Sequence, residues 1–322
     1  MATKDMKATL VEKDLSPANG HRAILIAGPT ASGKSALAIE LAERWNGVVI
    51  NADSMQLYRE LSIVTARPSG ADMDRVPHRL YGTMAAKVQF STGGWLRLIS
   101  GELDQVRAEG KVPVLVGGTG LYFKALTLGF AEIPEIEPDI RLRCRQIADD
   151  GGVEAVREAL LPLDPEAAES LADLQRLTRA LEVVRSTGQT IGTWQRQAHG
   201  APLIPLADAR CVVLGPPRPW LHERIALRAK LMLSEAGIAE VRSLLALDLP
   251  TSLPVMRAIG VKEIAEYLAG SIDLAETERR LTVATRQYAK RQETWFRNQM
   301  ADWQRLDPSS GEPHGLADQL KN

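Results

Sequence analysis

One short stretch limits the folds open to this chain more than any other, the sequence GPTASGKS at residues 28–35. It satisfies the pattern G-x-x-x-x-G-K-[ST], follows the apolar run AILIA at Ala23–Ala27 and leads into a helical pattern over Ser35–Trp45. The glycines let the backbone turn several amides inward, and the start of the helix adds a positive partial charge. The stretch therefore predicts a strand, a phosphate-binding loop (P-loop) and a helix. A chance glycine-rich turn is the structural alternative, but it does not explain the full motif between both flanking elements.

The positions of the loop have predicted tasks. Lys34 supplies a positive charge to a bound phosphate, and the Ser35 hydroxyl is a ligand for Mg²⁺, the one cofactor that we predict. The residues predicted to bind a diphosphate or nucleotide phosphates are Gly28, Pro29, Thr30, Ala31, Ser32, Gly33, Lys34 and Ser35.

Further short apolar runs repeat the strand signature. They lie at Gly47–Ile50, Val112–Val116 and Cys211–Gly215, with helical patterns such as Trp95–Gly110 between them. Continuous apolar runs of this length are typical of a parallel sheet covered by helices on both faces. From about residue 128 to residue 209 the pattern is helical, with no convincing strand. The predicted fold class is α/β, a P-loop NTPase-like parallel sheet core with an inserted, mainly helical domain.

Proline-rich breaks place the domain boundaries, AEIPEIEPD before the insertion and APLIPL after it. The predicted organisation is a flexible leader over residues 1–21, a P-loop catalytic core with C-terminal helices over 22–127 and 207–305, an inserted helical domain over 128–206, and a polar tail over 306–322.

Composition restricts the setting in which the chain works. Its net charge of −1 gives no overall attraction to nucleic acid or anionic lipid, so such binding needs charge that is gathered locally. The two cysteines, Cys144 and Cys211, form no CxxC pair, which favours a reducing compartment over a disulfide framework. The first residues lack the apolar core of a signal peptide, and no apolar run approaches the roughly 20 residues that span a bilayer. We therefore expect a cytoplasmic protein without a membrane partner. A monomer is our separate prediction.

Two polar residues follow the predicted strands at the edge where ligands bind. Asp53 comes after the second strand, in NADSMQLY, and Thr119 comes after the third, in GGTGLY. Open parallel sheets place their ligands at the carboxyl ends of the strands, so both side chains are expected to face the phosphate-binding loop. The structural alternatives are a turn-forming or helix-capping aspartate and a threonine hydroxyl that caps the helix expected over Leu121–Leu126.

The chain resembles the bacterial tRNA dimethylallyltransferases, also called tRNA isopentenyltransferases or the IPP transferase family. The motifs that carry the resemblance occur in the family's order over most of the chain. They are GPTASGKS, NADSMQLY, VTARP at Val64–Pro68, PHRL at Pro77–Leu80, GGTGLYFKAL at Gly117–Leu126, DLQRLTRALEV at Asp173–Val183, RAIG at Arg257–Gly260 and ATRQYAKRQETWFR at Ala284–Arg297.

The resemblance implies transfer of a dimethylallyl group from dimethylallyl diphosphate to the exocyclic amine of the adenine just 3′ of a tRNA anticodon. The loop then holds the diphosphate, and Lys34 stabilises the charge that builds on it as it leaves. Asp53 is the candidate general base for the amine, with Thr119 bonded to the same base or substrate. Thr30 is expected to donate to the bridging oxygen of the diphosphate. The predicted catalytic residues are Asp53, Thr119, Thr30 and Lys34.

Cations gather on two predicted helices although the net charge is only −1, and one of them is the helix Asp173–Arg185 of the insertion. The resemblance implies that the inserted domain over 128–206 binds tRNA. Arg286, Lys290 and Arg297 share one face of a late helix, although such rows are often simply solvated. Arg224 and Arg228 are candidates for closing over the diphosphate and are left outside the predicted site. The predicted tRNA-binding residues are Asp53, Ser54, Met55, Gln56, Thr119, Arg141, Gln175, Arg176, Leu177, Thr178, Arg179, Arg257, Lys262, Arg286, Lys290, Arg291 and Arg297.

Three other functions stay open from the sequence. A prenyltransferase that modifies free AMP or ATP needs the same loop and base but not the cations of the inserted helix. A P-loop small-molecule kinase consumes ATP and needs no prenyl donor. An RNA-binding module with a vestigial loop gains nothing from keeping Lys34, Ser35 and Asp53 together.

Overall fold

The computed structural model of the chain describes residues 22–131, 133–197 and 200–309. These residues divide into two compact units. The first comprises the described residues up to Thr127 and those from Leu203 onward, and the second is Leu128–Pro202. The predicted leader lies outside the described residues, as does the predicted tail from residue 310 onward.

The first unit is built on a six-stranded sheet in which every pair of neighbours is parallel. The spatial order is β3-β2-β4-β1-β5-β6. The α/β fold predicted from the sequence is confirmed, and its four expected strands form the centre of this sheet. The strands are β1 (Ala23–Ala27), β2 (Gly47–Asn51), β3 (His78–Arg79), β4 (Val112–Gly117), β5 (Ala209–Leu214) and β6 (Gln304–Leu306).

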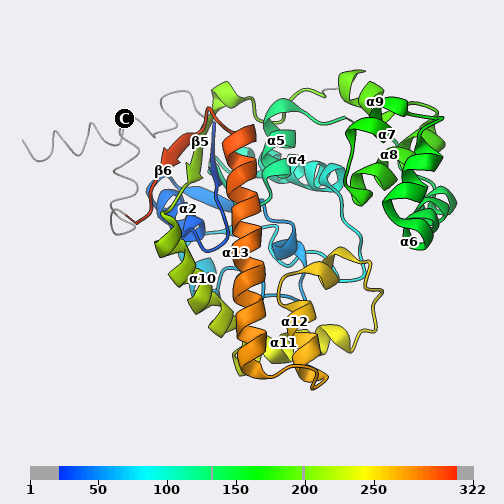
Figure 1. Cartoon of the computed structure of the whole chain (residues 1–322). Coiled ribbons are helices and arrows are strands. Elements are labelled where there is room, and N and C mark those ends of the chain that lie inside the picture. Colours follow the sequence, from blue (N-terminus) through cyan, green and yellow to red (C-terminus); the bar gives the residue numbers. More distant parts are fainter. Residues whose placement is uncertain (1–21, 132, 198–199, 310–322) are drawn as a thin grey trace, which may run out of the picture. The chain divides into compact units, whose positions relative to one another are not determined.

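Helices of the first unit cover the sheet and continue beyond it (Figure 1). They are α2 (Lys34–Arg44), α3 (Gly70–Arg75), α4 (Thr92–Ala108), α5 (Gly120–Leu128), α10 (Arg218–Met232), α11 (Glu235–Leu245), α12 (Val261–Leu268) and α13 (Leu274–Gln299), with the short 3₁₀ helices η2 (Met55–Leu57), η3 (Leu206–Asp208) and η4 (Pro254–Arg257). None of the helices in the described part of the chain is long and apolar enough to cross a membrane.

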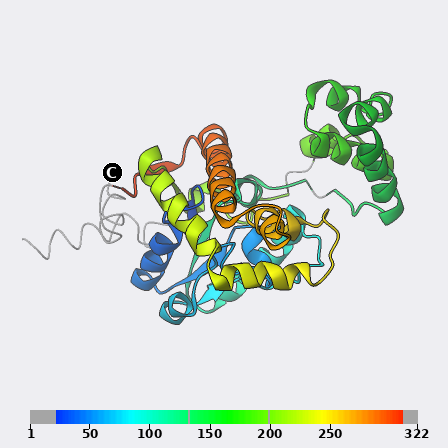
Figure 2. The same cartoon turned by 60° about the horizontal axis from the view of Figure 1, so that its bottom comes forward.

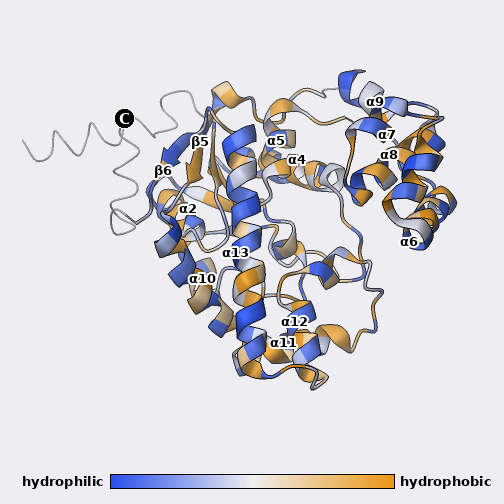
Figure 3. Ribbon diagram, in the orientation of Figure 1, coloured by the Kyte–Doolittle hydropathy of each residue, from blue (hydrophilic) through white to orange (hydrophobic). Residues whose placement is uncertain are grey.

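The four central strands β2, β4, β1 and β5 are mainly apolar because both faces of the sheet are buried. On one face Leu25 belongs to a cluster with Trp95 of α4 and Phe296 of α13. On the other face Ile26 packs in a cluster with Leu37 of α2. In Figure 3 strand β5 is accordingly orange, whereas α13 alternates between blue and orange along its length.

The strand register brings three loops to one edge of the sheet. Ala27, the last residue of β1, pairs with Gly117 at the end of β4, and Asn51 at the end of β2 pairs with Val116. The phosphate-binding loop, the loop after β2 and the loop after β4 therefore begin beside one another, as the parallel topology predicts.

The C-terminal helices of the first unit form a layer of their own. The long α13 (orange) packs against α10 and α12, and α11 packs against α12 (Figures 1 and 2). Their shared cluster includes Met232 of α10, Ile264 of α12 and Leu281 of α13, together with Val64 from the VTARP stretch. This cluster connects the C-terminal third of the chain to a loop that follows β2.

The second unit is helical. No strand occurs among its described residues, 128–131, 133–197 and 200–202. Its helices are α6 (Pro138–Leu160), α7 (Pro165–Ser170), α8 (Leu174–Thr187) and α9 (Ile191–Gln197). Helix α6 packs on α8, with Cys144 and Leu181 in the shared core. Gly152 has a φ of 61° inside α6, which marks a kink between two helical segments.

Candidate active site

The GPTASGKS loop has the backbone of an anion-binding turn. Gly33 precedes α2 with a φ of 86°, in the left-handed region that favours glycine, and Ala31 also has a positive φ of 64°. A Cβ on Gly28 would lie 2.8 Å from Oγ of the buried Ser32, which explains a glycine there. The amides of Ala36 and Leu37 donate to the carbonyl of Gly33, whereas those of Lys34 and Ser35 at the start of α2 remain available to an anion.

Lys34 lies within this turn. Its Nζ donates to the carbonyl of Pro29 over 3.3 Å. Burial lowers the pKa of Lys34 to about 8, a shift that the nearby Asp53 carboxylate opposes and Arg228 reinforces. A lysine with this pKa is a cation at neutral pH that can lose its charge at moderately alkaline pH.

Asp53 is held at the end of β2 by a small network. The Asn51 side chain accepts from the Asp53 amide (2.8 Å) and donates to its carbonyl (2.9 Å). The Asp53 Oδ1 accepts from the amide of Met55 at 3.1 Å, so the turn-forming role is present. Because this bond uses only one carboxylate oxygen, Oδ2 stays free of it.

The Thr119 side chain bonds to the loop after β2. Its Oγ1 accepts from the amide of Ser54 at 3.0 Å and lies 3.3 Å from the Ser54 hydroxyl. The hydroxyl therefore joins the loop after β4 to the loop after β2, directly beside Asp53.

The Asp53 carboxylate faces cationic groups of the phosphate-binding region. Its charge acts to raise the pKa of Lys34 and that of Arg228, although burial lowers both. Burial and the same carboxylate together raise the pKa of Tyr288 from α13 and that of Tyr81. The structure thus brings Asp53, Thr119 and the phosphate-binding loop to one edge of the sheet.

Two residues from late in the chain complete this region. Arg228 of α10 donates to Oγ1 of Thr30 (2.5 Å) and to the carbonyl of Val64 (3.1 Å). Gln292 of α13 accepts from the amide of Thr30 at 2.8 Å and donates to the carbonyl of Gly118 at 2.9 Å. Both Arg228 and Gln292 lie outside the site predicted from the sequence. The available signal was a polar residue within the buried stripe of an otherwise amphipathic helix.

Glycines after β4 allow close approach to this region. A Cβ on Gly118 would lie 2.3 Å from Nε2 of Gln292 and 3.1 Å from Oδ2 of Asp53. A Cβ on Gly120 would lie 2.2 Å from the ring of Trp295. Gly118 and Gly120 therefore let the loop after β4 pack closely against Asp53 and α13.

The residues predicted to contact tRNA in the first unit lie in different surroundings. Met55 and Gln56 are half-buried, and the Gln56 side chain donates to the carbonyls of Thr65 and Ala66. The cationic candidates are all exposed, namely Arg257, Lys262, Arg286, Lys290, Arg291 and Arg297. Lys262 lies 4.0 Å from Glu266, whereas the described residues provide no ion pair to Arg286, Lys290 or Arg297.

In the second unit the predicted contact residues divide by exposure. Gln175 and Arg176 are exposed on α8, whereas Leu177 is buried in the core of that unit and Thr178 is 8% exposed. Arg179 lies 3.3 Å from Glu182 on the same helix. Arg141 is partly exposed near the start of α6. The Asp173 side chain accepts from the backbone amide of Arg176 at 3.0 Å, so it caps α8.

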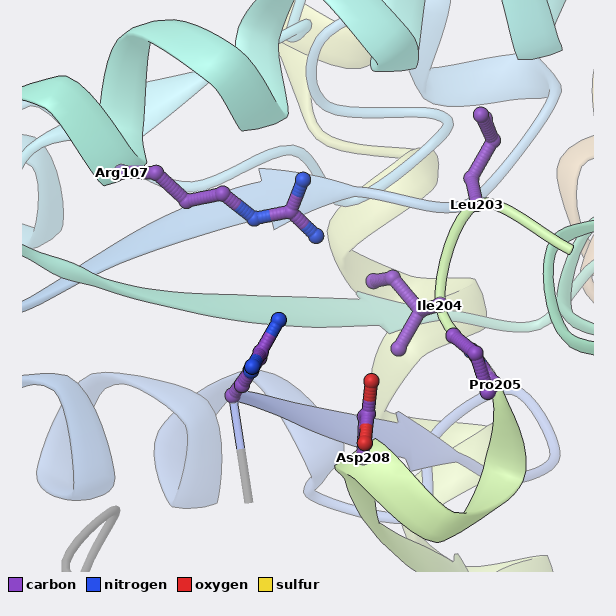
Figure 4. A pocket seen from close by; sticks show the side chains of 6 residues that line it. Arg107, Leu203, Ile204, Pro205 and Asp208 are labelled. Carbon is purple, nitrogen blue, oxygen red and sulfur yellow. The ribbon is translucent and has the colours of Figure 1, made fainter. Parts of the chain in front are cut away.

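A separate cavity lies at the opposite end of the sheet. It measures about 360 Å³ and is lined by Arg22, Arg107, Leu203, Ile204, Pro205 and Asp208 (Figure 4). Arg22 precedes β1 and Asp208 precedes β5, so the cavity borders the amino ends of these strands. No predicted site residue lines it.

Across the described ranges, no three His, Cys, Asp or Glu side chains gather as they do in an all-protein metal site. Magnesium rarely uses such a cage and is usually bound by one or two protein oxygens together with substrate phosphates. The Ser35 hydroxyl, predicted as a magnesium ligand, lies in the first turn of α2.

Comparison with known proteins decides the family. A family model described as IPP transferase matches residues 56–299, and one described as isopentenyl transferase matches residues 21–89. The tRNA dimethylallyltransferase of Agrobacterium fabrum is 52% identical over 291 residues, which cover 89% of this chain and 97% of the relative. That of Sinorhizobium medicae is 50% identical over 297 residues, 91% of this chain and 97% of the relative. The chain belongs to the tRNA dimethylallyltransferase family.

Solved structures of tRNA dimethylallyltransferases share the fold. The tRNA isopentenylpyrophosphate transferase of Bacillus halodurans superposes with a TM-score of 0.67 at 32% identity, covering 93% of this chain and 94% of that one. A eukaryotic dimethylallyltransferase acting on tRNA gives a TM-score of 0.77 at 26% identity, with 93% and 77% covered. The resemblance inferred from the motifs is confirmed, as is the P-loop NTPase-like core with its helical insertion.

Proposed function

We propose that this chain transfers a dimethylallyl group from dimethylallyl diphosphate to the exocyclic amine of the adenine 3′-adjacent to a tRNA anticodon, with release of diphosphate. Family membership supports the transferase activity and both substrate classes. The observation that carries the proposed mechanism is the position of Asp53 directly after β2, at the sheet edge where the phosphate-binding turn and the loop after β4 also begin. Its carboxylate accordingly acts to raise the pKa of Lys34 within that turn. A base for the acceptor and a cradle for the leaving group therefore share one site.

The donor diphosphate is proposed to occupy the turn at residues 28–35. The free amides at the start of α2 and the Lys34 ammonium match its negative charge. Arg228 adds a second cation beside Thr30. As the allylic C–O bond breaks, its electron pair leaves with the diphosphate, and these groups are in place to stabilise that charge.

The hydrogen bond from Arg228 supports a direct role for Thr30. A guanidinium has only donors, so Oγ1 of Thr30 must be the acceptor in that bond. The Thr30 hydroxyl proton then points elsewhere and is free to donate to the bridging oxygen of the diphosphate. The loop backbone and α10 together would fix the direction of this donor.

Magnesium fits this arrangement as a companion of the diphosphate. The Ser35 hydroxyl is the protein ligand that we propose, and the remaining ligands would be phosphate and water oxygens. When bound, the ion supplies further neutralisation of the leaving group's charge.

Asp53 is proposed to act as the general base on the acceptor. The adenine amine is a weak nucleophile because its lone pair is delocalised into the ring. As its nitrogen forms a bond to the allylic carbon, one N–H proton passes to the carboxylate. Met55 binds only Oδ1, which leaves Oδ2 for the amine. Thr119, whose hydroxyl bonds to the neighbouring Ser54, is proposed to hydrogen-bond the same base or the substrate.

The acceptor adenine must leave its stack to reach this site, at a cost of a few kcal/mol that phosphate contacts and stacking have to recover. We propose the unpaired cations of α13 for this contact, together with Arg257 and Lys262. In the second unit the candidates are Arg141, Arg179 and the exposed pair Gln175 and Arg176. Leu177 has a buried side chain and Thr178 a nearly buried one, so any contact from this pair would come mainly through the backbone.

We also propose that the chain works as a monomer in the cytoplasm. Both Cys144 and Cys211 are free thiols, and burial raises the pKa of each. Unreactive, unpaired cysteines agree with a reducing compartment.

The test is mass spectrometry of nucleosides after incubation of the protein with labelled dimethylallyl diphosphate and Mg²⁺, with tRNA, AMP or ATP as acceptor in parallel. The proposal predicts label on one adenosine of tRNA only. Label on AMP or ATP instead would identify a free-nucleotide prenyltransferase. Phosphorylated product without use of the prenyl donor would identify a kinase.

A further inference from the structure

Gln292 is a polar residue in an apolar position. It lies on the stripe of α13 that also carries Ala289 and Phe296, and only 6% of its surface is exposed. An amide in a buried stripe is costly unless both of its ends are hydrogen-bonded. Here both ends are bonded, and the partners come from two different loops of the site.

The orientation of the amide follows from its partners. The Thr30 N–H can only donate and the Gly118 carbonyl can only accept, so Oε1 faces Thr30 and Nε2 faces Gly118. The first loop holds the predicted diphosphate site. The second lies against Asp53, since a Cβ on Gly118 would be 3.1 Å from Oδ2 of that residue.

Thr30 is consequently fixed from two sides. Gln292 of α13 engages its amide, and Arg228 of α10 engages its hydroxyl oxygen. In a phosphate-binding loop the backbone amides normally turn toward the anion, but this one is directed at the helix. The two bonds leave the Thr30 hydroxyl proton as its remaining donor.

We propose that Gln292 is a positioning residue. It sets the separation between the phosphate-binding loop, which holds the leaving group, and the loop after β4, which packs on Asp53. The inference rests on the proposed function. One side chain spans the donor side and the acceptor side of the reaction, so the distance between the allylic carbon and the amine depends on it. Misplacement of reacting groups by about 1 Å can cost roughly 100-fold in rate.

Two substitutions of Gln292 separate the effect of its hydrogen bonds from the effect of the space that its side chain fills. Gln292→Met keeps the length of the side chain but forms neither hydrogen bond. Gln292→Glu retains an acceptor for the Thr30 amide and loses the donor to the Gly118 carbonyl. Gln287→Met is the matched control, because Gln287 is exposed on the same helix.

The experiment measures single-turnover prenylation of tRNA at saturating donor, together with donor and tRNA affinity and thermal unfolding. We expect the chemical rate of both Gln292 variants to fall by about 10- to 100-fold with near wild-type affinities in the folded protein. Gln287→Met should match the wild type. A rate close to wild type in the Gln292 variants, or a loss that follows affinity or folded fraction alone, overturns the inference.

A double-mutant cycle with Thr30→Val adds a second readout, the coupling between the two side chains in the reaction rate. A residue that only stabilises the fold would not produce such a coupling. If Gln292 acts through Thr30, its substitution should cost less in the Thr30→Val background than in the wild type. Full additivity of the two rate effects contradicts that route. If the wild type itself modifies no tRNA, the proposed function fails, whereas an active wild type with fully active Gln292 variants defeats only this inference.

Discussion

The Arg228 guanidinium donates to the Thr30 hydroxyl over 2.5 Å, although the two residues stand 198 positions apart in the chain. The contact joins a helix in the last third of the sequence to the phosphate-binding loop at residues 28–35. Since arginine cannot accept a hydrogen bond, the Thr30 proton is left to a third partner, for which the diphosphate is our proposal.

Replacing Thr30 tests that proposal. Thr30→Val keeps the shape of the side chain and removes the O–H donor, so the rate of prenyl transfer should fall by about 10- to 1,000-fold, as for loss of a donor to a developing negative charge. Thr30→Ser retains the hydroxyl, so its rate of prenyl transfer should stay close to that of the wild type. Single-turnover rates of the two variants decide the matter, and equal rates in both would contradict a donor role.

The Lys34 ammonium should make donor binding pH-dependent. Burial places the pKa of this group at about 8, so it is charged at neutral pH and becomes neutral as pH rises through that value. The donor's Kd, measured by calorimetry from about pH 6.5 to about pH 9.5, should be flat below the pKa and rise above it by at most about tenfold per pH unit. The free lysine of an unfolded chain titrates at 10.5, so the cost of burying the charge is present below about pH 8 and is relieved between the two values.

Lys34→Arg provides the control for this titration. Arginine stays charged across the whole range, so its donor affinity should lose the alkaline decline even if the affinity itself is lower. A persistent decline in this variant would assign the titration to another group.

The exposed cations of α13 should act through tRNA phosphates. Arg286→Ala and Lys290→Ala should each weaken tRNA binding and reduce the slope of log K against log salt by about 1. Arg279→Ala is the matched control on the same helix, because Arg279 already pairs with Glu276. Indistinguishable salt slopes for these variants and the control would remove this face of α13 from the tRNA interface.

Gly118 should not tolerate a side chain. Gly118→Ala places a methyl group 2.3 Å from Nε2 of Gln292 and 3.1 Å from Oδ2 of Asp53, so one or both must move. We expect a folded protein with transfer reduced by at least about tenfold. Gly101→Ala on α4 meets nothing within 4 Å and should leave activity unchanged while adding up to about 1 kcal/mol of stability.

The phosphate-binding loop, and Asp53 and Thr119 at the ends of their strands, could be predicted from the sequence. The loop motif is contiguous, and Asp53 and Thr119 each follow an apolar run, so the rule that parallel strands meet at one edge places them together. The four central strands were visible for the same reason. Strands β3 and β6 were not, because runs of 2 and 3 residues give no period and are defined only by their neighbours.

The supports of the site were harder to see. Periodicity showed that α13 has a buried face, but it could not show that Gln292 on that face reaches a loop 262 positions earlier. Arg228 lies next to the buried Ala229 on α10, a helix whose leucines lie both inside and outside the core. Such contacts depend on how α10 and α13 pack, which local sequence does not specify.

The central claim is that the Asp53 carboxylate takes the proton of the acceptor amine. Asp53→Asn is the sharpest test, because asparagine can still accept from the Met55 amide and so keeps the turn. We predict that the single-turnover rate on tRNA falls by about 100- to 10,000-fold while tRNA affinity stays close to that of the wild type. A variant that prenylates tRNA at the wild-type rate, or that loses only its binding, would contradict it.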